Sequence, residues 1–431
     1  MRIVALTNET KQDILKNLLK RSPGQYPEYE ATVQEIIDHV KKEGDQALIT
    51  YSKKFDGCEL TADSMRVTEQ EIEEAYAAYD PELIAVMKRA HDNIEEYHKK
   101  QIRYSWIDTR ADGTILGQKI TPLEKVGVYV PGGKAAYPSS TMMCVIPAKV
   151  AGVDRIIMMT PPGKTGIVNP GILVAAKICG VTEIYKVGGA QAIAALAYGT
   201  ETIPNVYKIV GPGNIFVALA KKAVYGNVSI DSIAGPSEIL VLADDTANPR
   251  YVAADLLSQA EHDELASAIL ITTSRKLAEK VSDEIDALMK QLSRAEIIQK
   301  SLDQYGYILL AESMEEAIEV ANDIASEHLE IMTESPYEVM TKIRNAGAIF
   351  IGENSSEPLG DYYAGPNHVL PTNGTAKFFS PLGVDEYIKK SSIISYSKNA
   401  LHEAHTDIEK FAVSEGLTAH ANSIKVRFEG E

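Results

Sequence analysis

The chain has 431 residues, of which 45% are hydrophobic and 24% are charged, as is typical of a globular protein. This length exceeds what one hydrophobic core supports, so we expect two or more domains. Lys and Arg number 43 against 60 Asp and Glu, which gives a net charge of −17. Because an acidic surface repels nucleic-acid phosphates and anionic lipids, we expect neither nucleic acid nor membrane as a partner.

The N-terminus and the cysteines indicate a cytoplasmic protein. The opening residues, MRIVALTNETKQ, do not show the basic and then apolar pattern of a signal peptide. No apolar run approaches the roughly 20 residues that a membrane helix needs. The three cysteines, Cys58, Cys144 and Cys179, lack metal or redox spacing, which excludes a disulfide framework and favours a reducing compartment. Cys144 and Cys179 lie in apolar segments, where we expect them to be buried.

The first 125 residues are predicted to be helical. The stretch EATVQEIIDHVKKEGDQALITYSKKFDG has apolar residues at helical spacing and ends at a glycine. Thr68 and Glu71 predict a capping box, and Asp80-Pro81 predicts the start of a further helix. Three histidines in this part lie among charged residues and are expected to be solvated: His39, His91 and His98.

From about residue 126, short apolar runs alternate with helix-like segments. Four runs are predicted strands: VGVYVPGG, RIIMMTPP, EIYKVGG and YKIVGPG. The helical segments between them end at Gly152, Gly180, Gly199 and Gly226. Strands that alternate with helices in this way predict a parallel sheet with right-handed crossovers.

A second alternating block follows, with predicted strands in SAILITTS, YILLA and AIFIG. Asn248-Pro249 is predicted to begin a helix that continues through Gln259 and His262. Ser313 and Glu316 are predicted to cap a helix that reaches Glu327. Two further helices, in DIEKFAVSEG and LTAHANSIKVR, are expected near the end of the chain.

These patterns predict an α/β protein with two Rossmann-like parallel-sheet α/β domains and small helical segments at the N- and C-termini. The expected division is an N-terminal helical segment at 1–25, a larger α/β domain from 26–125 and 239–380, a second α/β domain at 126–238, and a C-terminal helical tail at 381–431.

Two pairs of residues in the larger predicted domain are candidates for chemistry. Gln259 and His262 are three apart on a predicted helix, so both side chains leave one face. Imidazole is a good zinc ligand and an amide oxygen is a weaker one. Glu327 and His328 form a pair of bases with different pKa values near neutral pH. Taken alone, each pair is better explained by the ordinary charge pattern of a helix C-terminus.

Two further segments carry His and carboxylate residues. LGDYYAGPNHVLP places Asp361 in a predicted turn between glycines and His368 on the same loop. An Asx turn would also explain Asp361. In VSEGLTAHANSI, Glu415 ends one predicted helix and His420 begins the next, so both side chains can face one point. A helix stop with two solvated side chains would also explain the pattern. The nearby pair His402 and His405 also has metal-ligand spacing, but its polar surroundings favour a solvated helix face.

The motifs alone do not identify the cofactor. The GxGxxG dinucleotide fingerprint and the GxxxxGK[ST] phosphate loop are both absent. Glycine pairs at 132–133 and 188–189 and the GPG at 211–213 each follow a predicted strand. Glycines there let backbone N–H groups approach an anion, although tight turns between strands and helices use them as well.

Taken together, these segments resemble the histidinol dehydrogenase family, NAD-dependent enzymes of histidine biosynthesis. The matching stretches are GVYVPGG, VGGAQAIAALAYGT, IVGPGN, AGPSEILV, DLLSQAEHD, EHLE, GDYYAGPNHVLPT and EGLTAHANSI. They follow the family's order from about Glu124 to Arg427. The resemblance implies a four-electron oxidation of L-histidinol through L-histidinaldehyde to L-histidine, with one zinc ion per subunit and NAD. It also implies a homodimer in which the tail of one chain completes the site of the other.

The resemblance also implies roles for individual residues. The implied zinc ligands are Gln259, His262, Asp361 and His420. The implied substrate contacts are Ser237, Gln259, His262, His328, Asp361, Glu415 and His420. The implied NAD contacts are Tyr129, Gln191 and Asn214, and the implied catalytic bases are Glu327 and His328.

The chain departs from the family at Ser326, where proline is usual, and at Ala364, where serine is common. Neither change removes an implied ligand or base, but either can shift loop geometry. Three other functions stay open from the residues alone: a metal hydrolase, a binding protein without catalysis, and a dehydrogenase of another small polar alcohol.

Overall fold

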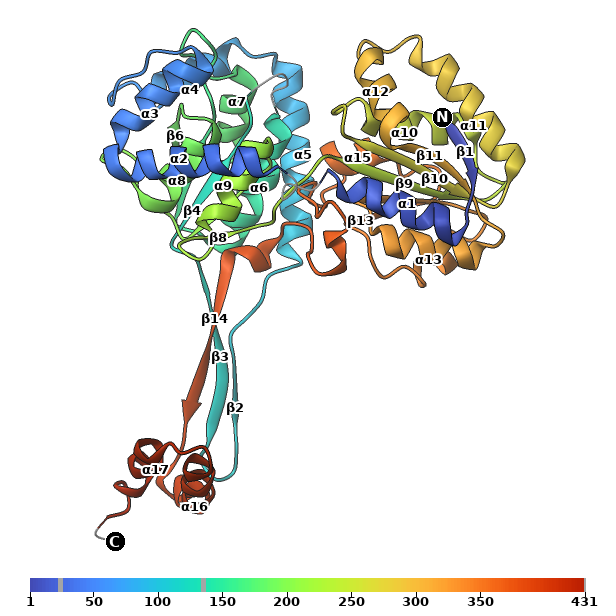
Figure 1. Ribbon diagram of the computed structural model, residues 1–431. Coiled ribbons are helices and arrows are strands. Elements are labelled where there is room, and N and C mark those ends of the chain that lie inside the picture. The colour runs from blue at the N-terminus through green and yellow to red at the C-terminus, as the bar shows by residue number, and fades with distance from the viewer. Residues whose placement is uncertain (22–25, 133–136, 430–431) are drawn as a thin grey trace. The chain divides into compact units, whose positions relative to one another are not determined.

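The computed structural model describes residues 1–21, 26–132 and 137–429. The chain forms two compact units, which Figure 1 shows. The first unit comprises Met1–Gln101 and Leu123–Tyr387, and the second comprises Ile102–Pro122 and Ile388–Glu431. The glycine pair predicted at 132–133 lies partly outside the described residues, because Gly133 is not among them.

A six-stranded parallel sheet forms one half of the first unit, with the strand order β1-β11-β10-β9-β12-β13. Its strands are β1 (Arg2–Ala5), β9 (Glu238–Ala243), β10 (Ser267–Thr272), β11 (Gly306–Leu310), β12 (His328–Met332) and β13 (Ala348–Ile351). Strands β9, β10 and β12 are buried at every position, as expected where helices cover both faces of a parallel sheet.

Helices cover both faces of this sheet (Figure 1). One face carries α10 (Pro249–Ala260), α11 (Arg275–Met289) and α12 (Ala295–Tyr305). The other carries α1 (Asn8–Leu19), α13 (Met314–Ile324) and α14 (Pro336–Met340). The predicted side-chain caps at Asn248 and Ser313 are confirmed. A short helix, α15 (Glu357–Tyr362), follows β13.

A five-stranded parallel sheet forms the other half of the first unit, with the strand order β6-β5-β4-β7-β8. Its strands are β4 (Lys125–Tyr129), β5 (Arg155–Met159), β6 (Glu183–Tyr185), β7 (Lys208–Val210) and β8 (Ser229–Ile230). The parallel pairing that the alternating pattern predicted is therefore confirmed for both sheets.

Among the residues that the structure describes, eight helices pack on the five-stranded sheet. One side carries α2 (Pro27–Glu43), α3 (Asp45–Tyr51), α8 (Gly189–Tyr198) and α9 (Ile215–Val224). The other side carries α4 (Glu69–Ala78), α5 (Pro81–Lys99), α6 (Pro138–Ala151) and α7 (Pro170–Ile178). A π-helical turn (Ser52–Asp56) follows α3. The predicted capping box of Thr68 and Glu71 begins α4.

The N-terminal part differs from the expected arrangement in two ways. Helices between residues 27 and 99 pack with the five-stranded sheet, whereas we expected 26–125 to join 239–380. The apolar face of α2, which includes Val33 and Ile37, packs against the alanine-rich helix α8, and this contact decides the grouping. The expected helical segment 1–25 also begins with strand β1, which pairs with β11 and is too short to show alternation.

The second unit is a three-stranded antiparallel sheet with two helices. The strands are β2 (Trp106–Thr109), β3 (Ile115–Pro122) and β14 (Ile388–Ser395), in the order β14-β3-β2. The helices are α16 (Lys398–Ser414) and α17 (Thr418–Lys425). Both tail helices were predicted. Strands β2 and β3 lie in the part that was predicted to be helical, so that prediction is wrong there. Strand β14 was not predicted either, because IKKSSIIS lacks an apolar alternation. Two 3₁₀ turns, Thr375–Lys377 and Val384–Tyr387, precede this strand.

His98 corrects one sequence-based expectation. It was expected to be solvated, but it is fully buried and its Nδ1 donates to the Ile94 carbonyl at 2.7 Å. The reason is the helical spacing of α5, which places Ile84, Ile94 and His98 on its buried face. The expected burial of Cys144 and Cys179 is confirmed, and Cys58 is buried as well; all three are free thiols.

Within the described ranges, no helix is both long enough and apolar enough to cross a lipid bilayer.

Candidate active site

A pocket of about 600 Å³ in the first unit brings together most of the predicted site residues. The residues that line it include Asn214, Ser237, Gln259, His262, Glu327, His328 and Asp361. These residues come from β-to-α loops, helix ends and strand starts that lie far apart in the sequence. Their convergence is what the predicted site requires of the first unit.

Gln259 and His262 reach this pocket from the end of α10. Gln259 lies in the last turn and is buried. His262 lies beyond the helix, which ends at Ala260, so the expectation that one helix face presents both side chains is wrong. The His262 N–H still donates to the Gln259 carbonyl at 3.2 Å, which keeps the two residues together. Burial lowers the pKa of His262, which favours the neutral imidazole that binds metal ions.

Glu327 and His328 lie at the start of a strand, not at the predicted helix end. Helix α13 ends at Ile324 because Ala325 adopts a left-handed conformation with φ of 53°. Glu327 then precedes β12, and His328 is its first residue. Both side chains are almost completely buried.

The neighbouring strand orients both side chains. The backbone N–H of Glu238, at the start of β9, donates to Glu327 Oε2 at 2.9 Å. The Glu238 carbonyl accepts a hydrogen bond from His328 Nδ1 at 2.9 Å. In the neutral imidazole, this bond places the proton on Nδ1 and leaves the lone pair on Nε2. His328 Nε2 lies 3.5 Å from Asp361 Oδ1.

The electrostatic environment raises the pKa values of both Glu327 and His328. Burial raises the pKa of Glu327 to about 7. Burial disfavours the charged form of His328, but the carboxylates of Glu327 and Asp361 outweigh it and raise its pKa to about 10. A divalent cation beside Asp361 would oppose this second effect, because it offsets the negative charge that stabilises imidazolium.

Asp361 lies within helix α15 and not in the turn that the glycines predicted. Burial disfavours its ionised form, but the nearby His328 and His368 side chains outweigh burial and lower the pKa of Asp361 to about 2. The carboxylate is therefore ionised and able to bind a cation. His368 supports it from the following loop, where Nδ1 contacts the Asp361 carbonyl at 3.0 Å and Nε2 contacts Ser140 Oγ at 3.0 Å.

Glu357 is a residue of the site that sequence reasoning missed. It is 2% exposed and accepts a hydrogen bond from Ser258 Oγ at 2.9 Å. Burial raises its pKa to about 8. His328, Glu357 and Asp361 offer ligand atoms that all lie within 4.8 Å of one another. No sequence signal marked Glu357, since SSEPLGD has neither apolar periodicity nor a metal-ligand spacing.

The residues present suit a divalent metal ion. Among the described residues, neither Gln259 Oε1 nor His328 Nε2 has a hydrogen-bond partner, although both atoms are buried. Buried polar atoms are normally paired, so these two atoms beside an ionised Asp361 are free to contact a bound ligand. A set of imidazole nitrogen, amide oxygen and carboxylate oxygen is compatible with zinc.

The predicted NAD residues belong to the five-stranded half. Tyr129 ends β4, and its hydroxyl accepts a hydrogen bond from the Gly189 N–H at 3.0 Å. Gln191, two residues into α8, is buried, and its Oε1 has no partner within the described chain. Asn214 lines the pocket and caps α9, where its Oδ1 accepts from the N–H groups of Phe216 and Val217.

A buried ion pair holds the loop that leads to Asn214. Lys221 and Asp231 form this pair, and each also contacts the backbone of Gly211. Lys221 Nζ donates to the Gly211 carbonyl at 3.1 Å, and the Gly211 N–H donates to Asp231 Oδ2 at 2.8 Å. The GPG turn is therefore fixed from both sides at the pocket wall.

Glu415 and His420 lie in the second unit. Glu415 caps the end of α16, His420 lies in α17, and both are exposed. Their predicted convergence with Gln259, His262 and Asp361 stays a prediction. His402 and His405 contact one another on α16, and both pack against Phe428.

The α/β fold and a pocket lined by acid–base and metal-ligand side chains define a candidate enzyme, and comparisons with known proteins identify its family. The sequence profile described as histidinol dehydrogenase matches residues 19–428. The histidinol dehydrogenase of Clostridium acetobutylicum is 58% identical over 96% of this chain and 95% of its own length. That of Halalkalibacterium halodurans is 60% identical over 93% of this chain and 94% of its own. The chain belongs to the histidinol dehydrogenase family.

The structural comparison agrees with this membership. The crystal structure of histidinol dehydrogenase from Elizabethkingia anophelis superposes with a TM-score of 0.93 at 39% identity. The match covers 100% of this chain and 98% of that one. Family membership argues against the metal hydrolase and the non-catalytic binding protein that the residues alone left open.

Proposed function

We propose that this protein oxidises L-histidinol through L-histidinaldehyde to L-histidine, with two NAD⁺ reduced in succession. The observation that carries the proposal is the pocket that brings Glu327, His328 and Asp361 together with Gln259. Within the described part of the chain, Gln259 Oε1 and His328 Nε2 are buried there without a hydrogen-bond partner. Relatives named histidinol dehydrogenase, 58% and 60% identical along almost the whole chain, support the same substrate.

Zinc would be held by Gln259, His262 and Asp361 together with His420. A bound zinc ion would orient the substrate nitrogens and so place the carbinol carbon beside the nicotinamide. The lowered pKa values of His262 and Asp361 support this assignment, because both groups are then present in their metal-binding forms. Ser237 and Glu415 would add hydrogen bonds to the substrate.

His328 and Glu327 would divide the proton transfers. In the first oxidation, His328 Nε2 takes the hydroxyl proton while a hydride leaves the carbinol carbon for NAD⁺. In the second, Glu327 takes a proton from a water molecule while the water oxygen attacks the aldehyde carbon, and His328 returns its proton to the aldehyde oxygen, which gives the hydrate. His328 then accepts the hydroxyl proton of the hydrate, and a second hydride leaves for a fresh NAD⁺. Tyr129, Gln191 and Asn214 would contact the cofactor.

The second unit would act across a homodimer. We propose that Glu415 and His420 of one chain complete the pocket of the other. Several large apolar side chains of this unit are exposed, including Trp106, Ile394 and Phe411, and burying them against a partner would be favourable. Three buried free thiols support a reducing compartment such as the cytoplasm.

The direct test is the appearance of NADH absorbance when purified protein receives L-histidinol and NAD⁺. Two NADH should form per histidinol, and a chelator should remove the activity until zinc is restored. Oxidation of another small polar alcohol with higher kcat/KM would contradict the substrate. Full activity in a metal-free preparation would contradict the zinc assignment.

The division of labour has a test of its own. Glu327→Gln should spare NADH formation from histidinol during the first turnover far more than NADH formation from histidinaldehyde. The reason is that only aldehyde oxidation needs water activated by this carboxylate. Equal losses in both half-reactions would contradict the roles given to Glu327 and His328.

A further inference from the structure

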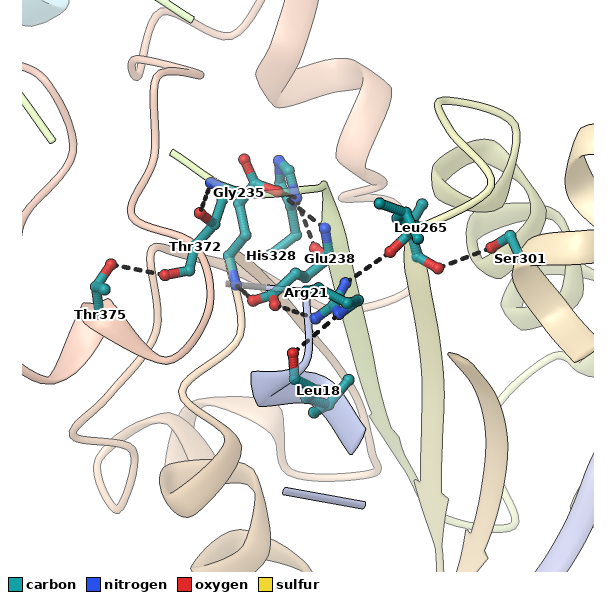
Figure 2. A network of polar contacts seen from close by, with 11 residues as sticks. Leu18, Arg21, Gly235, Glu238, Leu265, Ser301, His328, Thr372 and Thr375 are labelled. Carbon is teal, nitrogen blue, oxygen red and sulfur yellow. Dashed lines mark hydrogen bonds and ion pairs between the residues drawn. The ribbon is translucent and has the colours of Figure 1, made fainter. Parts of the chain in front are cut away.

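Arg21 is a buried cation just after helix α1, and its described partners lie inside the first unit. Its side chain is 0% exposed, although it contributes to the wall of the pocket. Nε donates to the Leu18 carbonyl at 3.3 Å, and Nη1 donates to the Leu265 carbonyl at 2.9 Å. Nη2 donates to Glu238 Oε1 at 2.5 Å. Figure 2 shows Arg21 between these partners.

Glu238 connects Arg21 to the two proposed bases. Its backbone N–H and carbonyl bind Glu327 Oε2 and His328 Nδ1, each at 2.9 Å. Its carboxylate also accepts a hydrogen bond from the Glu327 N–H at 3.4 Å. One residue therefore sets the position of the Glu327 carboxylate and the ring orientation of His328, while Arg21 sets the position of that residue.

The charges explain why a guanidinium is needed here. Glu238 is 3% exposed and Glu327 is 8% exposed, so two carboxyl groups lie close together out of water. The charge of Glu238 is compensated by Arg21. Without that cation, Glu238 would have to turn towards solvent or take up a proton. Either change would move the backbone N–H and carbonyl of Glu238, to which the side chains of Glu327 and His328 are hydrogen-bonded.

We propose that Arg21 is a positioning residue for the reaction, acting through Glu238 on Glu327 and His328. The inference rests on the proposed function for its kinetic consequence. Misplacing a reacting group by about 1 Å can reduce a rate on the order of 100-fold. Because the contacts of Arg21 do not include Gln259, His262 or Asp361, substrate and metal binding should be almost unchanged.

The experiment compares three variants of the full-length protein. Arg21→Met removes the charge, and Arg21→Lys keeps it but cannot reach three separate partners at once. Lys11→Met is the matched control, because Lys11 is a cation on α1 whose ion pair with Asp323 is partly exposed. The measurements are kcat, KM for histidinol and NAD⁺, single-turnover NADH formation, zinc content and melting temperature.

We expect Arg21→Met to reduce single-turnover NADH formation about 100-fold with KM within about threefold of the wild type. The rate of NADH formation by Arg21→Lys should lie between the rates of Arg21→Met and the wild type. The rate of Lys11→Met should match that of the wild type. A lower melting temperature for Arg21→Met with kcat within about twofold would show a purely structural role and overturn the inference. If Arg21→Met does not fold, the same kcat in Arg21→Lys as in the wild type overturns it.

A crystal structure of Arg21→Lys separates this inference from the proposed function. Displacement of the Glu327 carboxylate or of the His328 ring supports the positioning role even if the wild type proves inactive on histidinol. If both groups keep their positions, the inference fails, whatever the substrate is.

Discussion

Glu327 gives the site a pH dependence near neutrality. Burial raises its pKa to about 7, and a general base acts only in its ionised form. Below that value, kcat/KM for histidinaldehyde should fall by about tenfold for each pH unit, and above it the rate should level off. Steady-state rates between pH 5.5 and 9 measure this limb. A flat profile from pH 6 to 8 would contradict the proposed role of Glu327.

The variant His262→Asn is the most direct test of metal binding within the first unit. His262→Asn should lose most of the bound zinc, because an amide is a much weaker ligand than neutral imidazole. Metal content after gel filtration measures this loss. His402→Asn is the control, since His402 is exposed on α16 and should not affect the zinc content. A full equivalent of zinc in His262→Asn would show that the ligand assignment is wrong.

Asp56 is a partly buried carboxyl whose Oδ2 has no partner among the described residues. Burial raises its pKa to about 6 from an ordinary value of 3.8, so the folded protein holds the proton more tightly than the unfolded chain. Ionisation therefore reduces stability as pH rises from about 4 to 6. Asp56→Asn should raise the melting temperature at pH 8 and have little effect at pH 4.

The exposed residue Asp108 is the control for that comparison, because Asp108→Asn should not change the melting temperature at either pH. If Asp56→Asn lowers stability at pH 8, the carboxylate has a favourable partner and the argument from burial is wrong.

At the scale of elements, the GPG turn after β7 depends on Gly211. Its φ is +113°, and a Cβ atom there would lie 2.1 Å from the Tyr129 carbonyl oxygen. Gly211→Ala should therefore destabilise the protein by about 2–4 kcal/mol and raise KM for NAD⁺. Gly226→Ala is the matched control, with φ of +102° and no atom within 4 Å of the added Cβ. It should lose about 1 kcal/mol in urea unfolding. Equal losses of stability in the two variants would show that the structure relieves the clash between the added Cβ at Gly211 and the Tyr129 carbonyl oxygen.

Sequence patterns predicted elements where a local signal existed. Alternating strands and helices, the capping box at Thr68 and the side-chain cap at Asn248 are short-range features, and the structure confirms them. Strands β1 and β14 escaped prediction because the first is four residues long and the second is mostly exposed. Strands β2, β3, β8, β9 and β12 were not predicted either. Helix ends were less predictable, as the left-handed Ala325 before Glu327 shows.

The site was predictable to the extent that its chemistry is carried by motifs. Gln259, His262, Glu327, His328 and Asp361 stand in segments that resemble one family, and the structure brings them to one pocket. The residues that support them had no such signal. Arg21, Glu238 and Glu357 act through contacts between segments far apart in the chain, which spacing within one segment does not reveal.

At the scale of the whole molecule, a shared site predicts complementation between inactive variants. His262→Asn and His420→Asn should each be inactive alone, since each removes one zinc ligand. After subunit exchange, half of the dimers would be mixed and one of their two sites would be intact, so activity should recover to about a quarter of the wild type. Activity is measured by NADH formation after mixing and dilution. No recovery, with exchange verified by mass spectrometry, would contradict the shared site.

The three thiols can report when the half of the first unit that contains the five-stranded sheet opens. Cys58, Cys144 and Cys179 all pack with the five-stranded sheet, and residues 239–380 contain no cysteine. A disulfide reagent under native conditions can therefore modify a side chain only when that half opens. Burial raises the pKa of Cys179 to about 12, so the closed state is unreactive. Slower labelling when NAD⁺ is added would map the dinucleotide to this half without any engineered probe.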